Sequence, residues 1–101
     1  MSYKTFDGRT LQCQRTANGR YTVWIPTKWN LQPNDYLVML TGVGYIMDSS
    51  SNSSPVKATL TAKTASYFIV DISDDDSRNN GSFEFQIINM NDFTYNGDIK
   101  D

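Results

Sequence analysis

The sequence contains no histidine and only one cysteine, Cys13. Without histidine, the chain lacks the commonest general base, the commonest metal ligand and the usual side chain that titrates near neutral pH. A single cysteine cannot form an intrachain disulfide, which is typical of a reducing compartment or of a particle assembled in one. Apolar runs stay far below the ~18 residues that a membrane-spanning helix needs, and polar residues follow the N-terminal methionine. We therefore expect no transmembrane segment and no signal peptide.

The composition fits one globular domain. The 101 residues can build a single core, and 39% apolar and 13% aromatic residues are too many for a disordered chain. The net charge is -2 and the pI is about 4.8, so no overall positive field attracts phosphate or anionic lipid. Residues 1–47 carry five basic and two acidic side chains, and residues 48–101 carry four basic and nine acidic ones. This asymmetry suits head-to-tail assembly, although ordinary solvated surface also produces it.

Alternating apolar and polar residues predict a β-hairpin over residues 9–25. Its centre is Asn18-Gly19, the strongest short hairpin signal, because both residues accept positive φ. Pro26 ends the second strand, since proline cannot donate to a strand ladder. Residues 27–35 then form a connection with one helical turn at residues 28–30.

The rest of the chain predicts further short strands at residues 36–41, 45–47, 56–63, 67–72 and 83–87. Gly42 and Gly44 predict a bulge or bend that interrupts the first of these. Ser49–Ser54 is expected to be a flexible loop, and residues 73–81 a polar, acidic turn. The segment 67–72 has apolar residues on both sides, which indicates a central strand.

About six or seven short strands without strand–helix–strand alternation indicate one all-β domain over residues 1–101. We predict an antiparallel β-sandwich or a small barrel, with residues 1–8 and 89–101 as peripheral arms.

No catalytic or metal-binding constellation stands out. The acidic turn offers oxygen ligands for a calcium ion from Asp71 and three further aspartates. Its spacing does not fit the helix-loop-helix calcium pattern, so we expect a solvated loop there. Cys13 lies within an alternating strand without a histidine partner, which is typical of a small buried hydrophobe. Gly42-Val43-Gly44 lacks the third glycine and the helix of a phosphate-binding loop. We therefore predict no catalytic residues, no metal site and no cofactor.

Three arginines, Arg9, Arg15 and Arg20, fall in the predicted hairpin close to Trp24. A basic β-ribbon with an aromatic side chain could contact nucleic acid. Residues 19–38 also resemble the swapped-hairpin family of transition-state regulators, which have a strand ending in Ile-Pro, a short helix and a second strand. Asn34 replaces the glycine of that family and the helix is shorter. The acidic pI argues against nucleic acid as the partner.

Trp24 and Trp29 are the aromatic residue types that anchor protein interfaces, together with several tyrosines (Tyr21, Tyr36, Tyr45 and Tyr95). Trp24 should point away from the buried side of its strand, whereas Trp29 lies in a connection. Both could instead cover the edges of a small sandwich. If they are exposed, they indicate a partner, or less specifically a carbohydrate.

The sequence over residues 34–88 resembles the small immunoglobulin-like β-sandwich modules of tailed-phage virions. The similarity lies in the segments 34–42, 45–48, 56–60 and 67–73, and in the segment 80–87, where Asn80-Gly81 precedes Phe83-Glu84-Phe85. The resemblance implies an immunoglobulin-like sandwich that docks onto a protein lattice, and it carries no catalytic residues.

We therefore expect a non-enzymatic module that binds protein, as a head-decoration, neck, tail-fibre or baseplate component in a virion or in the host cytoplasm. The expected partner is a virion component or a second copy, in a homo-oligomer, and the candidate binding residues are Trp24, Trp29, Arg9, Arg15 and Arg20. A small DNA-binding regulator that uses the Arg9–Trp24 hairpin and a virus-encoded inhibitor of a host protein are the alternatives.

Overall fold

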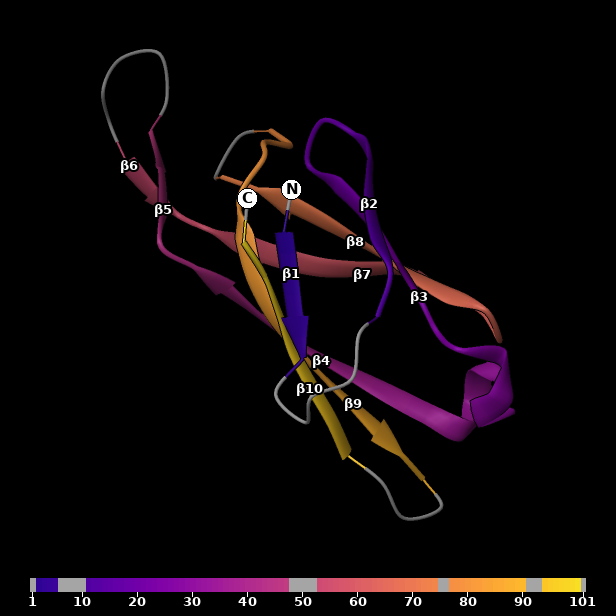
Figure 1. Cartoon of the computed structure of the whole chain (residues 1–101). Coiled ribbons are helices and arrows are strands. Elements are labelled where there is room, and N and C mark those ends of the chain that lie inside the picture. The colour runs from indigo at the N-terminus through magenta and orange to yellow at the C-terminus, as the bar shows by residue number, and fades with distance from the viewer. Residues whose placement is uncertain (1, 6–10, 48–52, 75–76, 91–93, 101) are drawn as a thin grey trace.

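The computed structural model describes residues 2–5, 11–47, 53–74, 77–90 and 94–100. These residues form β-strands and two short 3-10 helices and contain no α-helix, which confirms the predicted all-β class (Figure 1). The strands are β1 (Ser2–Thr5), β2 (Cys13–Ala17), β3 (Arg20–Trp24), β4 (Tyr36–Val43), β5 (Tyr45–Met47), β6 (Ser53–Pro55), β7 (Lys57–Lys63), β8 (Tyr67–Ser73), β9 (Ser82–Asn89) and β10 (Thr94–Lys100). The helices are η1 (Thr27–Trp29) and η2 (Pro33–Asp35).

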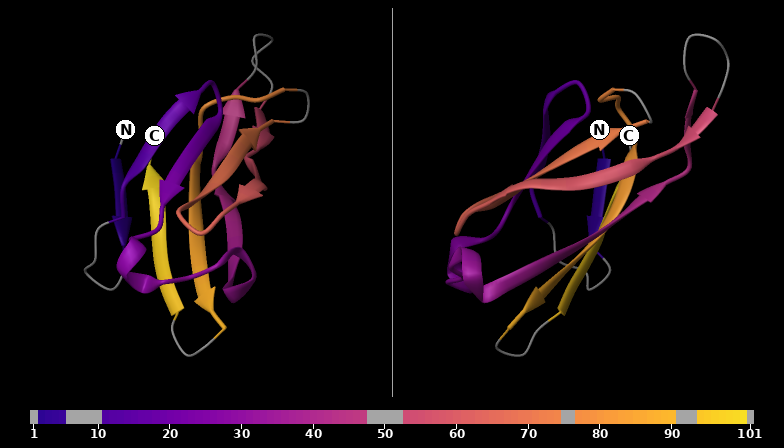
Figure 2. Two further views of the ribbon diagram at one scale, coloured as in Figure 1. Left: turned by 90° about the vertical axis from the view of Figure 1, so that its right-hand side faces the viewer. Right: turned by 180° about the vertical axis from the view of Figure 1, so that it is seen from behind.

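Two four-stranded antiparallel sheets pack face to face. Sheet A has the order β1-β10-β9-β4, and sheet B has the order β2-β3-β8-β7. β8 lies between β3 and β7, as its two apolar sides predicted. The remaining strands, β5 and β6, pair only with each other and form a hairpin that projects from one end of the sandwich (Figure 2).

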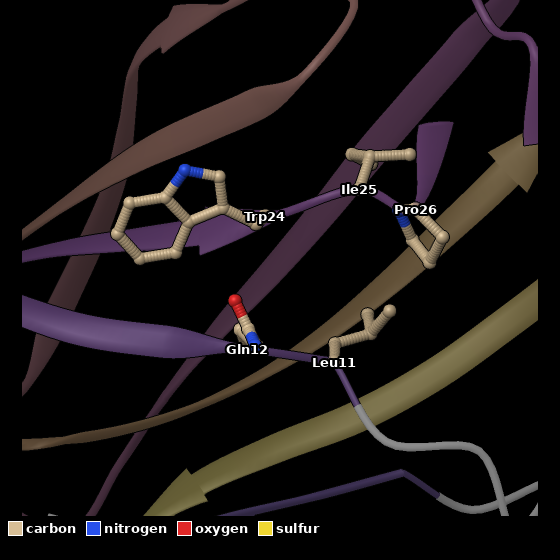
Figure 3. A pocket seen from close by; sticks show the side chains of 5 residues that line it. All are labelled: Leu11, Gln12, Trp24, Ile25 and Pro26. Carbon is tan, nitrogen blue, oxygen red and sulfur yellow. The ribbon is translucent and has the colours of Figure 1, made fainter. Parts of the chain in front are cut away.

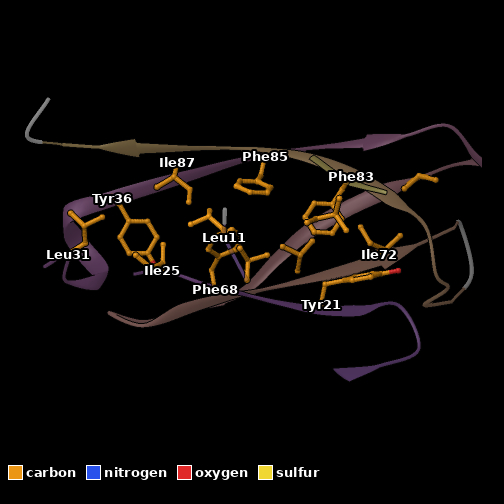
Figure 4. Close-up of a cluster of buried hydrophobic side chains, with 14 of the residues drawn as sticks. Leu11, Tyr21, Ile25, Leu31, Tyr36, Phe68, Ile72, Phe83, Phe85 and Ile87 are labelled. Carbon is orange, nitrogen blue, oxygen red and sulfur yellow. The ribbon is translucent and has the colours of Figure 1, made fainter. Parts of the chain in front are cut away.

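The inward side chains of both sheets form one hydrophobic cluster between them (Figure 4). Along β8 every second side chain is buried, as a strand with one face on the core requires. Edge-to-face ring contacts connect the sheets: Tyr21 of β3 lies 5.4 Å from Phe83 of β9, and Phe68 of β8 lies 5.7 Å from Phe85 of β9, measured between ring centroids. These contacts add to the burial of the four rings and fix how the sheets face each other.

The predicted hairpin is confirmed where β2 and β3 meet at Asn18-Gly19, and its turn is tied to β8. Gly19 has a φ of 70°, its carbonyl accepts the N–H of Ile72 at 2.7 Å, and its N–H donates to Oδ1 of Asn80 at 2.9 Å. An added Cβ at Gly19 would lie 2.7 Å from the Ile72 carbonyl oxygen. Both the backbone conformation and the space therefore require glycine in this turn.

β4 is longer than the sequence pattern predicts. The predicted interruption is confirmed at Gly44, where the chain bends between β4 and β5, but not at Gly42, because β4 continues to Val43. Gly42 instead permits a close approach, since an added Cβ would collide with the carbonyl group of Val56, 2.7 Å from its carbon. The left-handed backbone comes at Gly44, with a φ of 83°, and its carbonyl accepts the N–H of Val56 at 3.1 Å. The chain entering β7 thus meets β4 at these two glycines, and the β5–β6 hairpin extends beyond that point.

Three other segments differ from the sequence pattern. Ser53 and Ser54, expected in a loop, belong to β6 and pair with β5. The register of β7 against β8 shifts between Leu60 and Ala62, which breaks the regular alternation expected there. The two ends of the chain, expected as peripheral arms, contribute β1 and β10 to sheet A, with β10 between β1 and β9. The pairing of strands decides all three, and residue composition does not encode it.

Candidate functional site

Trp24 lies on the outer face of sheet B, pointing away from the buried Val23 and Ile25 as predicted. It is half-buried and stands opposite Tyr67 of β8 in the sheet register. A pocket of about 370 Å³ opens beside its indole and is lined by Leu11, Gln12, Trp24, Ile25 and Pro26 (Figure 3). None of these five side chains is ionisable. They can receive an uncharged group, but they supply no acid or base.

Arg20 is held in an ion pair on the same face. Its Nε and Nη2 donate to the two carboxylate oxygens of Asp71 at 2.7 and 2.8 Å. The hydrogen bond from Arg20 lowers the pKa of Asp71 from its ordinary value, although partial desolvation opposes this shift. The same hydrogen bond raises the pKa of Arg20. The charge of Arg20 is therefore matched within the domain, which weakens the basic patch predicted for this hairpin.

Of the other predicted binding residues, Arg15 and Trp29 lie in the described part of the chain, and neither lines the pocket. Arg15 is exposed on β2 and stands opposite Tyr21 in the register, and Arg9 lies outside the described residues. Trp29 belongs to η1 and packs, half-buried, against the hydrophobic cluster. The pocket is lined by Trp24 without Trp29, so the two tryptophans do not form one platform there.

Two of the predicted interface tyrosines are core residues. Tyr21 and Tyr36 are fully buried, so neither can contact a partner directly. The phenolic oxygen of Tyr36 donates to the carbonyl of Thr64 at 2.6 Å, and burial raises the pKa of Tyr36 to about 12. Each ring fills the core, and its hydroxyl finds a partner at the margin, as buried tyrosines usually do.

The acidic turn after β8 is partly engaged in internal contacts. Asp71 pairs with Arg20, and the buried Asp74 accepts the N–H of Ser77 at 2.9 Å through Oδ1. Asp75 and Asp76 lie outside the described residues, so the expectation of a solvated loop without a metal site stays a prediction there. Within the described ranges, no three histidine, cysteine or acidic side chains come close enough to hold a metal ion. Cys13 is half-buried against the core.

The exposed large hydrophobic residues of the described chain gather on and beside β4. They are Leu37, Met39, Val43, Tyr45 and Met90, with exposed fractions of 50%, 57%, 37%, 72% and 61%. Leu37, Met39 and Val43 alternate with inward residues and so lie on the outer face of sheet A. We call these three residues the apolar stripe. Tyr45 follows it beyond Gly44, and Met90 follows β9, the strand that pairs with β4.

The apolar stripe lies on an edge strand. Among the described strands, β9 is the only hydrogen-bonded neighbour of β4. On the outer face, β9 places the half-buried Ile88 opposite Leu37, and Glu84 opposite Thr41. Glu84 is the only charged side chain that β4 and β9 contribute to this face. A long, exposed, apolar edge strand is the kind of surface that pairs with another chain unless something blocks it.

Sequence reasoning missed the apolar stripe, although a signal for it exists. Residues 36–47 contain no charged side chain, and the flanking charges are Asp35 and Asp48. β4 therefore has apolar residues on both faces, like the central strand β8. The pattern alone does not distinguish a strand buried on both sides from an edge strand with an exposed apolar face.

Comparisons with protein-family models, with curated proteins and with solved structures found no match. None of the helices in the described part of the chain has the length and apolar character needed to cross a membrane.

Proposed function

We propose that the chain is a non-enzymatic docking module that binds another protein through the apolar stripe on the outer face of sheet A. One observation carries the proposal: the exposed large hydrophobic residues of the described chain are concentrated at β4 and its neighbours instead of being scattered. Scattered exposed apolar residues are normal on a soluble domain, whereas a contiguous group marks an interaction surface.

The chemistry of the surface favours a protein partner over a charged ligand. The stripe consists of two flexible side chains, Leu37 and Met39, and the stiffer Val43. Nucleic acid binding depends on cations that neutralise phosphates, and none of the residues 36–47 is charged. The basic hairpin of the DNA-binding alternative gains little support, because Asp71 already neutralises Arg20.

The specific form that we propose is a virion accessory component, such as a head-decoration, neck, tail-fibre or baseplate protein with an immunoglobulin-like sandwich. It is supported by the resemblance over residues 34–88 and by the two-sheet antiparallel architecture. In such a component the β-sandwich is a rigid support, and its exposed surface carries the function.

Variant-controlled capture tests this proposal. Tagged wild-type protein, the Met39→Lys variant and the Thr59→Lys control are used to capture proteins from extracts of the producing cells. Thr59 is exposed on β7 of sheet B, so its variant adds the same charge to the other sheet. We expect a partner that wild type and Thr59→Lys retain and Met39→Lys loses. A partner set unchanged by Met39→Lys would contradict the proposal, and co-purification with virus particles would test its specific form.

A further inference from the structure

The free edge of β4 is open over a short stretch, the backbone groups of Val38 and Leu40, which we call the window. The N–H of Met90, after β9, donates to the carbonyl of Asp35 at 2.8 Å, so the backbone carbonyl of Asp35 points toward β9. The carbonyl of Tyr36 instead accepts a hydrogen bond from Nζ of Lys63 of β7 at 2.6 Å, so the backbone carbonyl of Tyr36 points away from β9, toward the open edge. Because neighbouring residues of a strand direct their backbone groups to opposite sides, Val38 and Leu40 also face the open edge.

Both ends of this window are covered. Lys63 occupies the Tyr36 carbonyl at one end, where its ammonium also lies 4.9 Å from the centroid of the Tyr36 ring. At the other end the carbonyl of Gly44 accepts the N–H of Val56 at 3.1 Å, and Val56 also lies against the inward side of Gly42. Between the two, the backbone groups of Val38 and Leu40 have no strand neighbour among the described strands. Lysine side chains often prevent sheet edges from pairing with another chain, and here Lys63 covers only one end of the window.

We propose that this window pairs with the same window of a second copy, in an antiparallel two-fold arrangement centred on Met39. This inference rests on the proposed function, since it names the partner of the apolar stripe. An axis at Met39 pairs Val38 with Leu40 of the second copy and Leu40 with Val38, so all four open backbone positions are used. An axis at Val38 would require the carbonyl of Tyr36, which Lys63 occupies. An axis at Leu40 would use the backbone of Gly42, beside the Gly44 carbonyl that Val56 occupies.

The charges around the window allow a second copy of the chain to bind there. Residues 36–47 are uncharged, so the two strands themselves bring no like charges together. The ammonium of Lys63 lies at Tyr36, and its copy would lie at the other end of the window, six residues or about 20 Å away along the strands. The nearest charge on the outer face, Glu84 of β9, is separated from its copy by three strand spacings across the sheet, about 14 Å, and by four residues along the strands. That distance exceeds the ~8 Å over which salt at physiological strength screens exposed charges.

The paired arrangement also joins the two stripes. Met39 would stand directly opposite Met39 of the second copy, and Leu37 opposite Thr41, both as pairs without direct backbone hydrogen bonds, where side chains are closest. The two A sheets would become one continuous sheet, and the edge at β4 would disappear in both copies. A two-fold contact of this kind closes on itself and does not propagate into fibres.

Sedimentation of variants that carry opposite charges at position 39 tests the two-fold arrangement. Analytical ultracentrifugation of wild type should show a monomer–dimer equilibrium, and Met39→Lys and Met39→Glu should each weaken the dimer at least tenfold because two like charges meet on the axis. An equimolar mixture of the two variants should recover the dimer, and Thr59→Lys should match wild type. A wild-type protein that stays monomeric at all concentrations, or a mixture without recovery, would overturn the proposal.

Cysteine cross-linking tests the register. In a Cys13→Ser background, Met39→Cys should form an intermolecular disulfide with itself when two thiols pass two electrons to oxidised glutathione. Leu37→Cys should cross-link to Thr41→Cys but not to itself. Cross-linking of Met39→Cys no faster than that of an exposed Thr59→Cys would overturn the arrangement. Capture of a different protein by the stripe of a monomeric chain would also overturn it while supporting the proposed function, whereas failure of both capture and dimerisation would remove both.

Discussion

Replacing Gly42 with alanine tests whether the close approach of β4 and the chain entering β7 holds the β5–β6 hairpin on the sandwich. The φ of Gly42 is not in the left-handed region, so alanine there should not be strained. The added Cβ, however, would meet backbone atoms of Val56, which cannot rotate away as a side chain could. Overpacking in well-packed sites costs about 1–3 kcal/mol, and relief here requires the two backbones to separate. We expect Gly42→Ala to lower the free energy of unfolding by about 3 kcal/mol.

Gly44→Ala is the matched control for this substitution. Its φ of 83° penalises alanine by roughly 1–2 kcal/mol, but no heavy atom lies within 4 Å of the added Cβ. Part of that penalty is offset by the restricted unfolded chain, a gain of about 0.4–1 kcal/mol for Gly→Ala. We therefore expect a loss near 1 kcal/mol, clearly smaller than for Gly42→Ala. Urea unfolding followed by circular dichroism at one low protein concentration measures both values, and a Gly42→Ala variant as stable as wild type would refute the packing argument.

Three further substitutions test individual contacts. Tyr36→Phe should cost about 1–2 kcal/mol near pH 7, because the carbonyl of Thr64 loses its donor. The pKa of Tyr36 is raised to about 12, so the wild type should lose stability as the pH rises from 10 towards 12, and urea unfolding should show that Tyr36→Phe lacks this loss. Arg20→Met should lower the free energy of unfolding most above the ordinary pKa of Asp71. In acid titrations, the difference in this free energy between variant and wild type should shrink as the pH falls through the lowered pKa of Asp71. A difference that does not change with pH would contradict the ion pair. Asn80→Ala should cost about 1 kcal/mol in thermal unfolding, because the turn N–H bound by its side chain loses an acceptor, and no loss would show that this bond does not stabilise the turn.

Local signals predicted much of the fold. Asn18-Gly19 located the hairpin, although only Gly19 takes a positive φ there and Asn18 does not. The apolar residues on both sides of β8 indicated a central strand, and Trp24 points outward because alternation has a period of two. Such features depend on neighbours in sequence, so the sequence displays them directly.

Other features depend on contacts between distant segments. Gly42 suggested an interruption, but its purpose is to let Val56 approach, and no local pattern distinguishes the two. The engagement of Arg20 with Asp71 depends on the register of β3 against β8, which composition does not reveal. The same limit explains the missed apolar stripe, since apolar residues on both faces of β4 fit a buried strand as well as an exposed edge.

Site-specific photo-cross-linking at Leu37 tests most directly whether the apolar stripe is a contact surface. A photoreactive amino acid is placed at Leu37, or at Thr59 as the control on the other sheet, and the protein is illuminated inside the producing cells. Leu37 is half exposed on the outer face of sheet A, so the substitution should not disturb the core. We predict discrete protein adducts from position 37, a second copy of the chain among them, and none from position 59. Equal or absent cross-linking at the two positions would contradict the docking surface.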